Sequence, residues 1–294
     1  MATEPDAADT GVLWLVATPI GNLEDLGDRA RRVLAEADVV ACEDTRVTAK
    51  LLARCGISAR TLAYHEHNEQ RQSTRLVEML RSGKSVALVT DAGTPAVSDP
   101  GLVLVRKARE AGADVVPVPG PSAVLAALAA SGLPPRPFTF IGFLPSRRGE
   151  RRRALEAVAT LPHTLVLFES ARRLPASLRD MASTLGNRKA AVCRELTKLH
   201  EEILVDDLDS LASALEARDS VRGEITVVIG PPDENALAPT PSSLPGLADH
   251  WRRVQDETPD RKDALRRLAR ERNVSRRAVY RQLLDAGLMG DRDA

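Results

Sequence analysis

The sequence predicts an α/β protein of two domains followed by a small helical module. Three observations support this prediction: short apolar runs alternate with helical patterns from Val12 to Gly230, prolines interrupt them near residues 134–137, and a Pro- and Ser-rich stretch follows Gly230. Such alternation is typical of βα units and of a mostly parallel sheet. We therefore expect a disordered N-terminus (1–11), two α/β domains (12–134 and 135–230), a linker (231–245) and a basic, helix-turn-helix-like module (246–294).

The elements of the two domains follow in order along the chain. Residues 12–16 form the first apolar run, and the next segment carries an apolar stripe at helical spacing, made of Ala30, Val33, Leu34 and Ala37. Further strands of the first domain are expected at 39–42, 86–89 and 115–118. A second series of strands is expected at 138–143, 164–168, 190–193 and 224–229.

Composition restricts the class of protein. The chain has 294 residues, 43% of them hydrophobic, which is enough for two domains with cores of their own. Forty-one basic residues balance forty-one acidic ones, so the net charge neither favours nor excludes nucleic acid. Cys42, Cys55 and Cys193 lack metal-ligand spacing and fit a reducing cytoplasm. The N-terminus lacks a signal-peptide pattern, and no run of about 18 apolar residues occurs, so we expect a cytoplasmic protein that does not cross a membrane.

The loop at 90–101 is the strongest indication of a ligand site. It follows an apolar run, and ligands of parallel α/β sheets bind outside the carboxyl ends of the strands. Gly93 permits close approach of the backbone, and Asp91 offers a carboxylate. Asp99 can cap the next helix, with Pro100 in its first turn. Residues 17–22 and 119–123 follow two other strands in the same way. Each loop alone could be an ordinary turn, but together they predict one shared pocket.

Charged runs follow several strands, at 43–46, 65–69, 169–173 and 194–198. Charged side chains at one edge of a sheet suit binding and acid–base chemistry. His65 and His67 lie two residues apart, but no third ligand is evident, so no metal site is predicted. Nucleophile-elbow, P-loop and GxGxxG patterns are absent from the sequence, which leaves serine hydrolases, P-loop NTPases and classical dinucleotide enzymes unsupported.

The tail predicts two short helices with a basic surface. A helix starting at Thr258-Pro259 carries an apolar stripe and ends near Asn273, and Ser275 can cap a second helix. Residues 261–281 contain nine Lys or Arg, and another basic cluster surrounds Glu150. Both clusters could contact phosphates. Since Arg makes up thirty-five of the forty-one basic residues, a solvated surface is an equally ordinary explanation.

Taken together, these motifs resemble the ribosomal RNA methyltransferase branch of the tetrapyrrole methylase superfamily. The resemblance runs in order from about residue 12 to 230 and rests on the segments 17–23, 43–46, 65–69, 90–95, 119–123, 168–170, 194–198 and 223–224. It implies a class III methyltransferase fold, in which two α/β domains hold S-adenosylmethionine in the cleft between them. The first loop has Thr18, Pro19 and Ile20 where tetrapyrrole methylases tend to be glycine-rich, which argues against a porphyrinoid substrate.

The resemblance implies methyl transfer to the ribose 2′-hydroxyl of a cytidine in the decoding centre of 16S rRNA, in the small ribosomal subunit, by a homodimer. It also assigns cofactor contacts to Ile20, Gly21, Asp91, Gly93, Ser122, Ala123, Phe168, Glu169 and Glu195. As a hypothesis, the general base is Glu43, Asp44 or His65, and RNA phosphates are held by Arg46, Arg172 and Lys198. Two other functions stay open at this point: a methyltransferase of corrin or porphyrin precursors, and a non-catalytic ribosome-assembly factor.

Overall fold

A computed structural model describes residues 10–232, 246–258, 260–272, 274 and 276–289. By internal contacts the chain divides into two compact units, one comprising Met1–Leu155 and His163–Gly230, the other Glu156–Pro162 and Pro231–Ala294. Of the predicted disordered N-terminus (1–11), residues 1–9 lie outside the described residues, as do most of the predicted linker and the predicted roles of Pro259, Asn273 and Ser275. None of the helices in the described ranges is long and apolar enough to cross a membrane.

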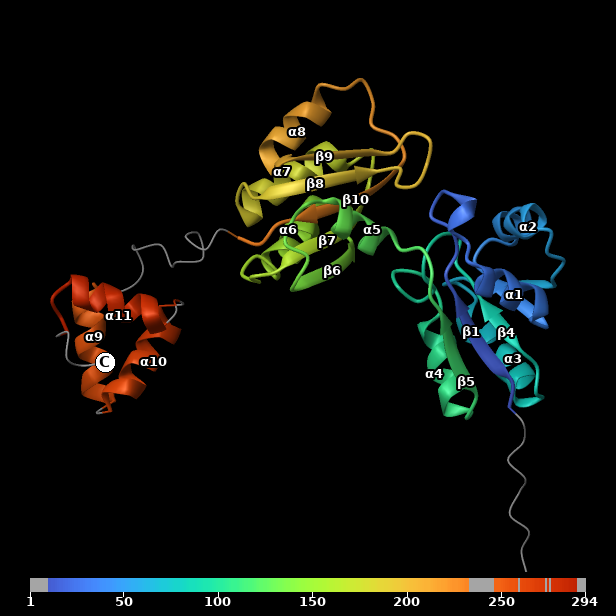
Figure 1. The fold of residues 1–294 in the computed structure, drawn as a ribbon, viewed down its shortest axis with the longest axis horizontal. Coiled ribbons are helices and arrows are strands. Elements are labelled where there is room, and N and C mark those ends of the chain that lie inside the picture. Colours follow the sequence, from blue (N-terminus) through green and yellow to red (C-terminus); the bar gives the residue numbers. More distant parts are fainter. Residues whose placement is uncertain (1–9, 233–245, 259, 273, 275, 290–294) are drawn as a thin grey trace, which may run out of the picture. The chain divides into compact units, whose positions relative to one another are not determined.

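The first sheet has five strands, which are all parallel. Its order is β3 (Thr61–Ala63), β2 (Val39–Cys42), β4 (Val86–Leu88), β1 (Val12–Val16) and β5 (Asp114–Val118). The sequence predicted this parallel arrangement, and the structure confirms it for this sheet. Because parallel strands end at the same edge, the loops after all five strands meet there. Figure 1 labels three of these strands, β1, β4 and β5.

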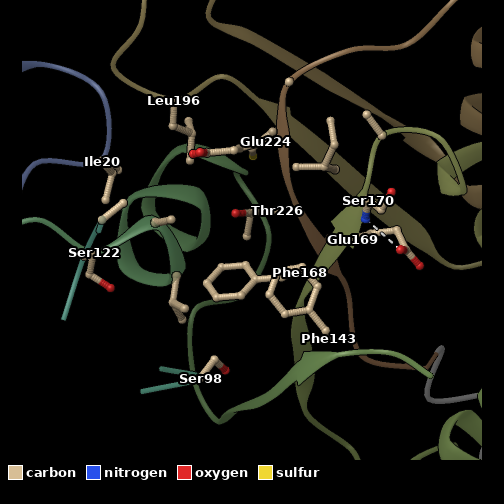
Figure 2. A pocket seen from close by; sticks show the side chains of 18 of the residues that line it. Ile20, Ser98, Ser122, Phe143, Phe168, Glu169, Ser170, Leu196, Glu224 and Thr226 are labelled. Carbon is tan, nitrogen blue, oxygen red and sulfur yellow. Dashed lines mark hydrogen bonds between the residues drawn. The ribbon is translucent and has the colours of Figure 1, made fainter. Parts of the chain in front are cut away.

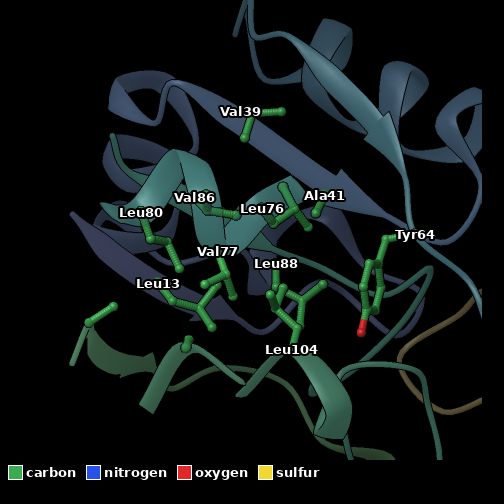
Figure 3. Close-up of a cluster of buried hydrophobic side chains, with 12 residues drawn as sticks. Leu13, Val39, Ala41, Tyr64, Leu76, Val77, Leu80, Val86, Leu88 and Leu104 are labelled. Carbon is green, nitrogen blue, oxygen red and sulfur yellow. The ribbon is translucent and has the colours of Figure 1, made fainter. Parts of the chain in front are cut away.

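Helices cover both faces of this sheet. The helices α3 (Glu69–Arg81) and α4 (Leu102–Glu110) pack on one face, where Leu13, Val86 and Leu88 join their apolar side chains in a core (Figure 3). The helices α1 (Asp28–Glu36) and α2 (Thr45–Arg54) cover the other face, and a short 3-10 helix, η1 (Leu23–Asp25), precedes α1. Successive strand residues alternate between the two cores, as the pleat of a strand requires.

The second sheet is mixed, which corrects the expectation of a mostly parallel arrangement throughout. Its order is β6 (Phe138–Phe143), β7 (Thr164–Ser170), β10 (Glu224–Ile229), β8 (Lys189–Arg194) and β9 (Glu202–Asp207). Only β6 and β7 pair in parallel, and the other three pairs are antiparallel. The reason is β9, which follows β8 after a short loop and therefore pairs with it antiparallel. The sequence pattern did not predict this strand.

The helices of the second half are α5 (Ala123–Ala130), α6 (Arg148–Glu156), α7 (Leu174–Leu185) and α8 (Leu208–Glu216). α5 follows the last strand of the first sheet but packs on the second, through Val124, Ala127 and Leu128. α7 and α8 pack on each other, and α8 contacts β8 and β9. The domain boundary predicted near residues 134–137 lies between α5 and β6. It stays a prediction.

The C-terminal module contains three helices in its described part: α9 (Leu247–Glu257), α10 (Arg261–Glu271) and α11 (Arg276–Asp285). They enclose a small core that includes Trp251, Leu268 and Leu283. The sequence predicted the last two helices and not α9. The cap of α10 is Asp260, whose carboxylate accepts the Asp263 N–H at 2.9 Å, rather than Thr258.

Candidate functional site

The strand order determines which loops become neighbours. At the carboxyl edge of the first sheet the loops follow the sequence β3, β2, β4, β1, β5. The loop of His65 therefore lies beside that of Glu43, which lies beside that of Asp91. On the far side of the Asp91 loop come the loops that carry Ile20 and Ser122. Of the seven segments singled out in the sequence, the five that belong to the first sheet are thus collected at one edge.

Backbone contacts join the loops after β1 and β4. The Thr18 N–H donates to the Gly93 carbonyl at 2.9 Å, and the Gly93 N–H returns a bond to the Thr18 carbonyl at 3.0 Å. The buried Thr18 hydroxyl also donates to the Thr90 carbonyl at 2.9 Å. Gly93 has a φ of +85°, which a residue with a side chain rarely adopts. The two loops therefore form one rigid structure with Gly93 at its centre.

The main cavity has a volume of about 680 Å³ and is bounded by both sheets. The first sheet contributes its loops after β1, β4 and β5, and the second contributes β7, β10 and neighbouring loops. In Figure 2, Ile20 and Ser122 lie on one side, and Phe143, Phe168 and Thr226 form another wall. The Phe168 ring contacts those of Phe140 and Phe143, with centroids 5.1 and 5.3 Å away.

Seven of the nine residues predicted to contact the cofactor line this cavity: Ile20, Asp91, Gly93, Ser122, Ala123, Phe168 and Glu169. Gly21 and Glu195 are not among its lining residues. Gly21 instead lies against the loop after β8, where an added Cβ would come within 2.4 Å of the Lys198 side chain. The adjacent Asn22 N–H donates to the Thr197 hydroxyl at 3.0 Å, so this contact ties the first half to the second.

The Glu169 carboxylate is hydrogen-bonded to neighbouring groups of the protein. The side chain is fully buried and accepts hydrogen bonds from the Ser170 N–H, the Arg173 guanidinium and the Ser177 hydroxyl, at 2.6, 2.7 and 2.6 Å. Figure 2 shows the bond to Ser170. A carboxylate with three donors is already satisfied. Its placement indicates that Glu169 shapes the cavity wall rather than offering a free acceptor.

Asp99 lines the main cavity and does not cap α4. The expected cap of α4 and the expected place of Pro100 in its first turn are both wrong, because the helix begins at Leu102 and its cap residue is Gly101, with no side-chain bond. Gly101 has a φ of +146° and an added Cβ would come within 2.9 Å of Leu88, so the chain turns into the helix there. The turn leaves Asp99 at the cavity.

A second cavity of about 410 Å³ adjoins the first. It is lined by Glu43, Asp44, Thr45, Arg46, Ala63, His65, His67 and Asp91. All three candidate bases therefore lie in one place. Asp91 lines both cavities, and its carboxylate accepts the Asp44 N–H at 3.1 Å. The single carboxylate of Asp91 thus forms a shared wall between the two spaces.

Glu43 has the environment of a proton acceptor. Burial, followed by the negative charges of Asp91, Asp99 and Asp44, raises the pKa of its carboxyl above the ordinary value. Burial likewise raises the pKa values of Asp91 and Asp99. Within the described part of the chain, the Glu43 carboxylate makes no hydrogen bond or ion pair. It is a free carboxylate whose proton affinity is increased by its surroundings.

Asp44 has the opposite environment. Its carboxylate caps α2 by accepting the Arg46 N–H at 2.8 Å, and it pairs with the Arg46 guanidinium at 2.6 Å. The hydrogen bonds from Arg46 hold the pKa of Asp44 far below its usual range. A carboxylate held in this way is a weak base, and Arg46 has much of its charge neutralised.

Asn68 fixes the ring of His65. The Asn68 Oδ1 accepts the His65 N–H at 2.9 Å, while its Nδ2 donates to the Ala63 carbonyl at 3.2 Å and lies 3.0 Å from His65 Nε2. Because Nδ2 can only donate, Nε2 is the acceptor, and the neutral ring carries its proton on Nδ1. Nδ1 is buried without a partner among the described residues. Neither ring nitrogen offers a free lone pair.

Lys198 is held by two carboxylates. Its Nζ lies 2.8 Å from Glu195 and 3.1 Å from Glu224, and Glu195 also accepts the Glu224 N–H at 2.9 Å. This network joins the loop after β8 to the start of β10. Of the three residues predicted to hold phosphates, Arg46 and Lys198 are therefore ion-paired, while Arg172 is exposed and lines the main cavity.

The backbone is strained in two of the cavity's loops. Among the described residues that are not glycine, positive φ angles occur at Ala96, Ser98, Glu195 and Thr197, between +51° and +66°. Two lie in the loop after β4 and two in the loop after β8. Strain of this kind costs about 1–3 kcal/mol per residue and concentrates at functional sites. Within the described ranges, no group of three or more His, Cys, Asp or Glu is placed to hold a metal ion.

Comparison with known proteins identifies the family. The family model for tetrapyrrole (corrin/porphyrin) methylases matches residues 12–212. "Ribosomal RNA small subunit methyltransferase I" of Mesorhizobium japonicum is 50% identical over 274 residues, 93% of this chain and 91% of that protein. The protein of the same name from Halalkalibacterium halodurans is 43% identical, over 92% of this chain and 94% of its own length.

Among solved structures, cobalt precorrin-4 methyltransferase, a cobalamin biosynthetic enzyme, matches with a TM-score of 0.56 and 24% identity, over 81% of this chain and all of that one. This likeness shows the fold. The family model and the two relatives show more, because they match most of the chain. The chain therefore belongs to the tetrapyrrole methylase family and, within it, to the ribosomal RNA small subunit methyltransferase I family.

Proposed function

We propose that this protein transfers a methyl group from S-adenosylmethionine to the ribose 2′-hydroxyl of a cytidine in the decoding centre of 16S rRNA. The names of the relatives support a ribosomal RNA substrate. The observation that carries the proposal is the pair of adjoining cavities with Asp91 as their shared wall. A methyl transfer needs a donor and an acceptor in contact, and two spaces separated by one side chain meet that need.

The main cavity fits the cofactor. Its volume of about 680 Å³ lies within the range of small-molecule sites, about 300–1,000 Å³. S-adenosylmethionine supplies a methyl group on a positively charged sulfonium. Asp91 and Asp99 give the cavity an acidic side that suits this charge, and Phe143 and Phe168 give it an apolar side. Gly93 lets backbone approach the ligand without a side chain between them.

We place the acceptor ribose in the second cavity and assign the general base to Glu43. The hydroxyl oxygen forms a bond to the methyl carbon, the carbon–sulfur bond breaks, and the hydroxyl proton passes to the Glu43 carboxylate. Glu43 suits this step because its carboxylate is free and its pKa is raised. Asp44 and His65 are engaged with Arg46 and Asn68, so they serve as supports of the cavity wall.

Positioning supplies much of the rate in this proposal. Well-oriented reacting groups reach effective molarities of about 10⁵ M or more. The bridge between Thr18 and Gly93 and the bond from Asp44 to Asp91 fix the walls of both cavities relative to each other. The reacting atoms therefore meet a preformed site.

We also propose that the C-terminal module contacts RNA. Five of its described basic residues, all exposed, make no ion pair with other described residues: Lys262, Arg270, Arg276, Arg277 and Arg281. Three of the five lie on α11. Exposed cations of this kind bind phosphates and release counterions. A homodimer and a cytoplasmic location are proposals that rest on the family, and light scattering of the purified protein tests the first.

Transfer of label tests the function. The purified protein is incubated with methyl-labelled S-adenosylmethionine and, in separate reactions, with small ribosomal subunits from cells that lack this gene, with free rRNA, or with a corrin or porphyrin precursor. We expect label in 16S rRNA. Label only in a corrin or porphyrin precursor would instead favour a small-molecule methyltransferase. Bound cofactor without transfer to subunits, free rRNA or precursors would favour an assembly factor.

A further inference from the structure

Two of the residues that line the main cavity are basic, Arg172 and Arg222. Both side chains are exposed. Neither forms an ion pair or a side-chain hydrogen bond with any residue that the structure describes, whereas Arg46 and Lys198 are paired with carboxylates. The cavity therefore has two guanidinium groups on the side of the second sheet that no described carboxylate pairs with.

Strand register places both arginines at the same end of the second sheet. Ser170 of β7 pairs with Glu224 of β10. Arg172 comes two residues after Ser170, and Arg222 comes two residues before Glu224. Because β7 and β10 are antiparallel neighbours, the chain leaves one strand and enters the other at this edge. The two arginines thus flank the same part of the cavity rim.

The loop of Arg222 is fixed by contacts with Glu195 and Lys198. Gly223 has a φ of +97°, and an added Cβ would lie 2.5 Å from the Glu195 side chain. Glu195 accepts the Glu224 N–H, and Lys198 bridges Glu195 and Glu224. These contacts fix the backbone on the C-terminal side of Arg222, so less conformational entropy is lost when its guanidinium binds a ligand.

We propose that Arg172 and Arg222 form a pair that binds the RNA phosphates flanking the acceptor nucleotide. Guanidinium groups bind phosphate oxygens through two parallel hydrogen bonds, and they keep their charge at every physiological pH. The distribution of charge around the cavity indicates that one side binds the methyl donor and the other binds RNA. The acidic residues Asp91 and Asp99 belong to the first half of the chain, where a cationic donor is favoured. The free positive charges belong to the rim of the second half. This inference rests on the proposed RNA substrate.

The test uses the full-length protein with Arg172→Gln, Arg222→Gln and the double variant. The matched control is Arg75→Gln, because Arg75 is exposed and unpaired among the described residues and lies on α3, outside both cavities. Affinity for small ribosomal subunits is measured over a salt series, and affinity for S-adenosylmethionine is measured by calorimetry.

Each phosphate contact contributes about 0.7 to 0.9 to the slope of log affinity against log salt. We expect each single variant to reduce the slope by about this amount, the double variant by about twice as much, and the control by nothing, with cofactor affinity unchanged. Unchanged slopes in variants of an enzyme that still methylates subunits would overturn this inference and leave the proposed function standing. A loss of cofactor affinity would also overturn it and would assign the arginines to the cofactor carboxylate. Failure of the wild type to bind or methylate subunits would overturn the proposed function as well.

Discussion

Replacement of Glu43 by Gln tests the proposed chemistry at a single atom. The variant keeps the size of the side chain and removes its ability to accept a proton. General-base catalysis contributes a factor of about 10² to 10⁴, which corresponds to about 2.7 to 5.4 kcal/mol of transition-state stabilisation. The other two candidate bases are occupied, Asp44 by Arg46 and His65 by Asn68. No substitute base is therefore ready in this cavity, and we expect the single-turnover rate of methyl transfer to fall by at least about 100-fold.

The assay is single-turnover methylation of small subunits at saturating S-adenosylmethionine, with cofactor affinity measured separately. Affinity should stay close to that of the wild type, because Glu43 lines only the second cavity. The control is Glu66→Gln, since Glu66 is exposed and outside both cavities. A Glu43→Gln enzyme that turns over within about threefold of the wild type would refute the assignment of the base.

The pH dependence gives an independent check on the same residue. A protonated Glu43 cannot accept the hydroxyl proton, so the rate falls as pH drops through its pKa. Burial and the neighbouring carboxylates raise that pKa, which places the fall at a higher pH than an ordinary glutamate would give. Asp99→Asn removes one of the negative charges and should move the acid limb of the profile to lower pH. A limb that stays in place would contradict the electrostatic argument.

Three further predictions concern stability and binding. Gly93→Ala forces a side chain into a φ of +85° and should destabilise the protein by about 1–3 kcal/mol and weaken cofactor binding, as calorimetry would show. Arg151 is almost fully buried and pairs with Asp180 at 2.6 Å, so Asp180→Asn leaves it without its counter-charge. Urea denaturation should show that the free energy of unfolding falls by about 3–5 kcal/mol. The control Asp209→Asn removes an exposed partner and should cost less than about 1 kcal/mol. Replacing three basic residues of α11 by Gln, namely Arg276, Arg277 and Arg281, should weaken binding to subunits and leave cofactor affinity unchanged. Unchanged binding to subunits would show that the module does not contact the RNA.

Much of the first domain could be predicted from the sequence because its signals are local. Apolar runs of four or five residues followed by Gly, Pro or Asp identify strands and the loops at their ends, and a parallel sheet brings those loops together whatever their order. The approximate site therefore followed from the chain alone. The strand order, which makes Asp91 the neighbour of both Glu43 and Ile20, did not.

The parts that were missed depend on contacts between distant segments. β9 alternates weakly, and its place at the edge of the second sheet is set by pairing with β8 rather than by its own pattern. Asp99 had the sequence signature of a helix cap, but the chain turns at Gly101 and the helix begins only at Leu102. The Asp99 carboxylate therefore does not cap the helix. Glu195 and Lys198 had the charges of ligand-binding residues, and only the structure shows that they pair with each other.

The most direct test of the account is the position of the transferred methyl group in 16S rRNA. Subunits methylated by the purified enzyme are subjected to partial alkaline hydrolysis, which requires a free 2′-hydroxyl at each cleaved linkage. We expect one new gap in the cleavage ladder, at a cytidine of the decoding centre, and no such gap after incubation with Glu43→Gln. Label on a base, with an unbroken ladder at every cytidine, would contradict the proposed ribose chemistry.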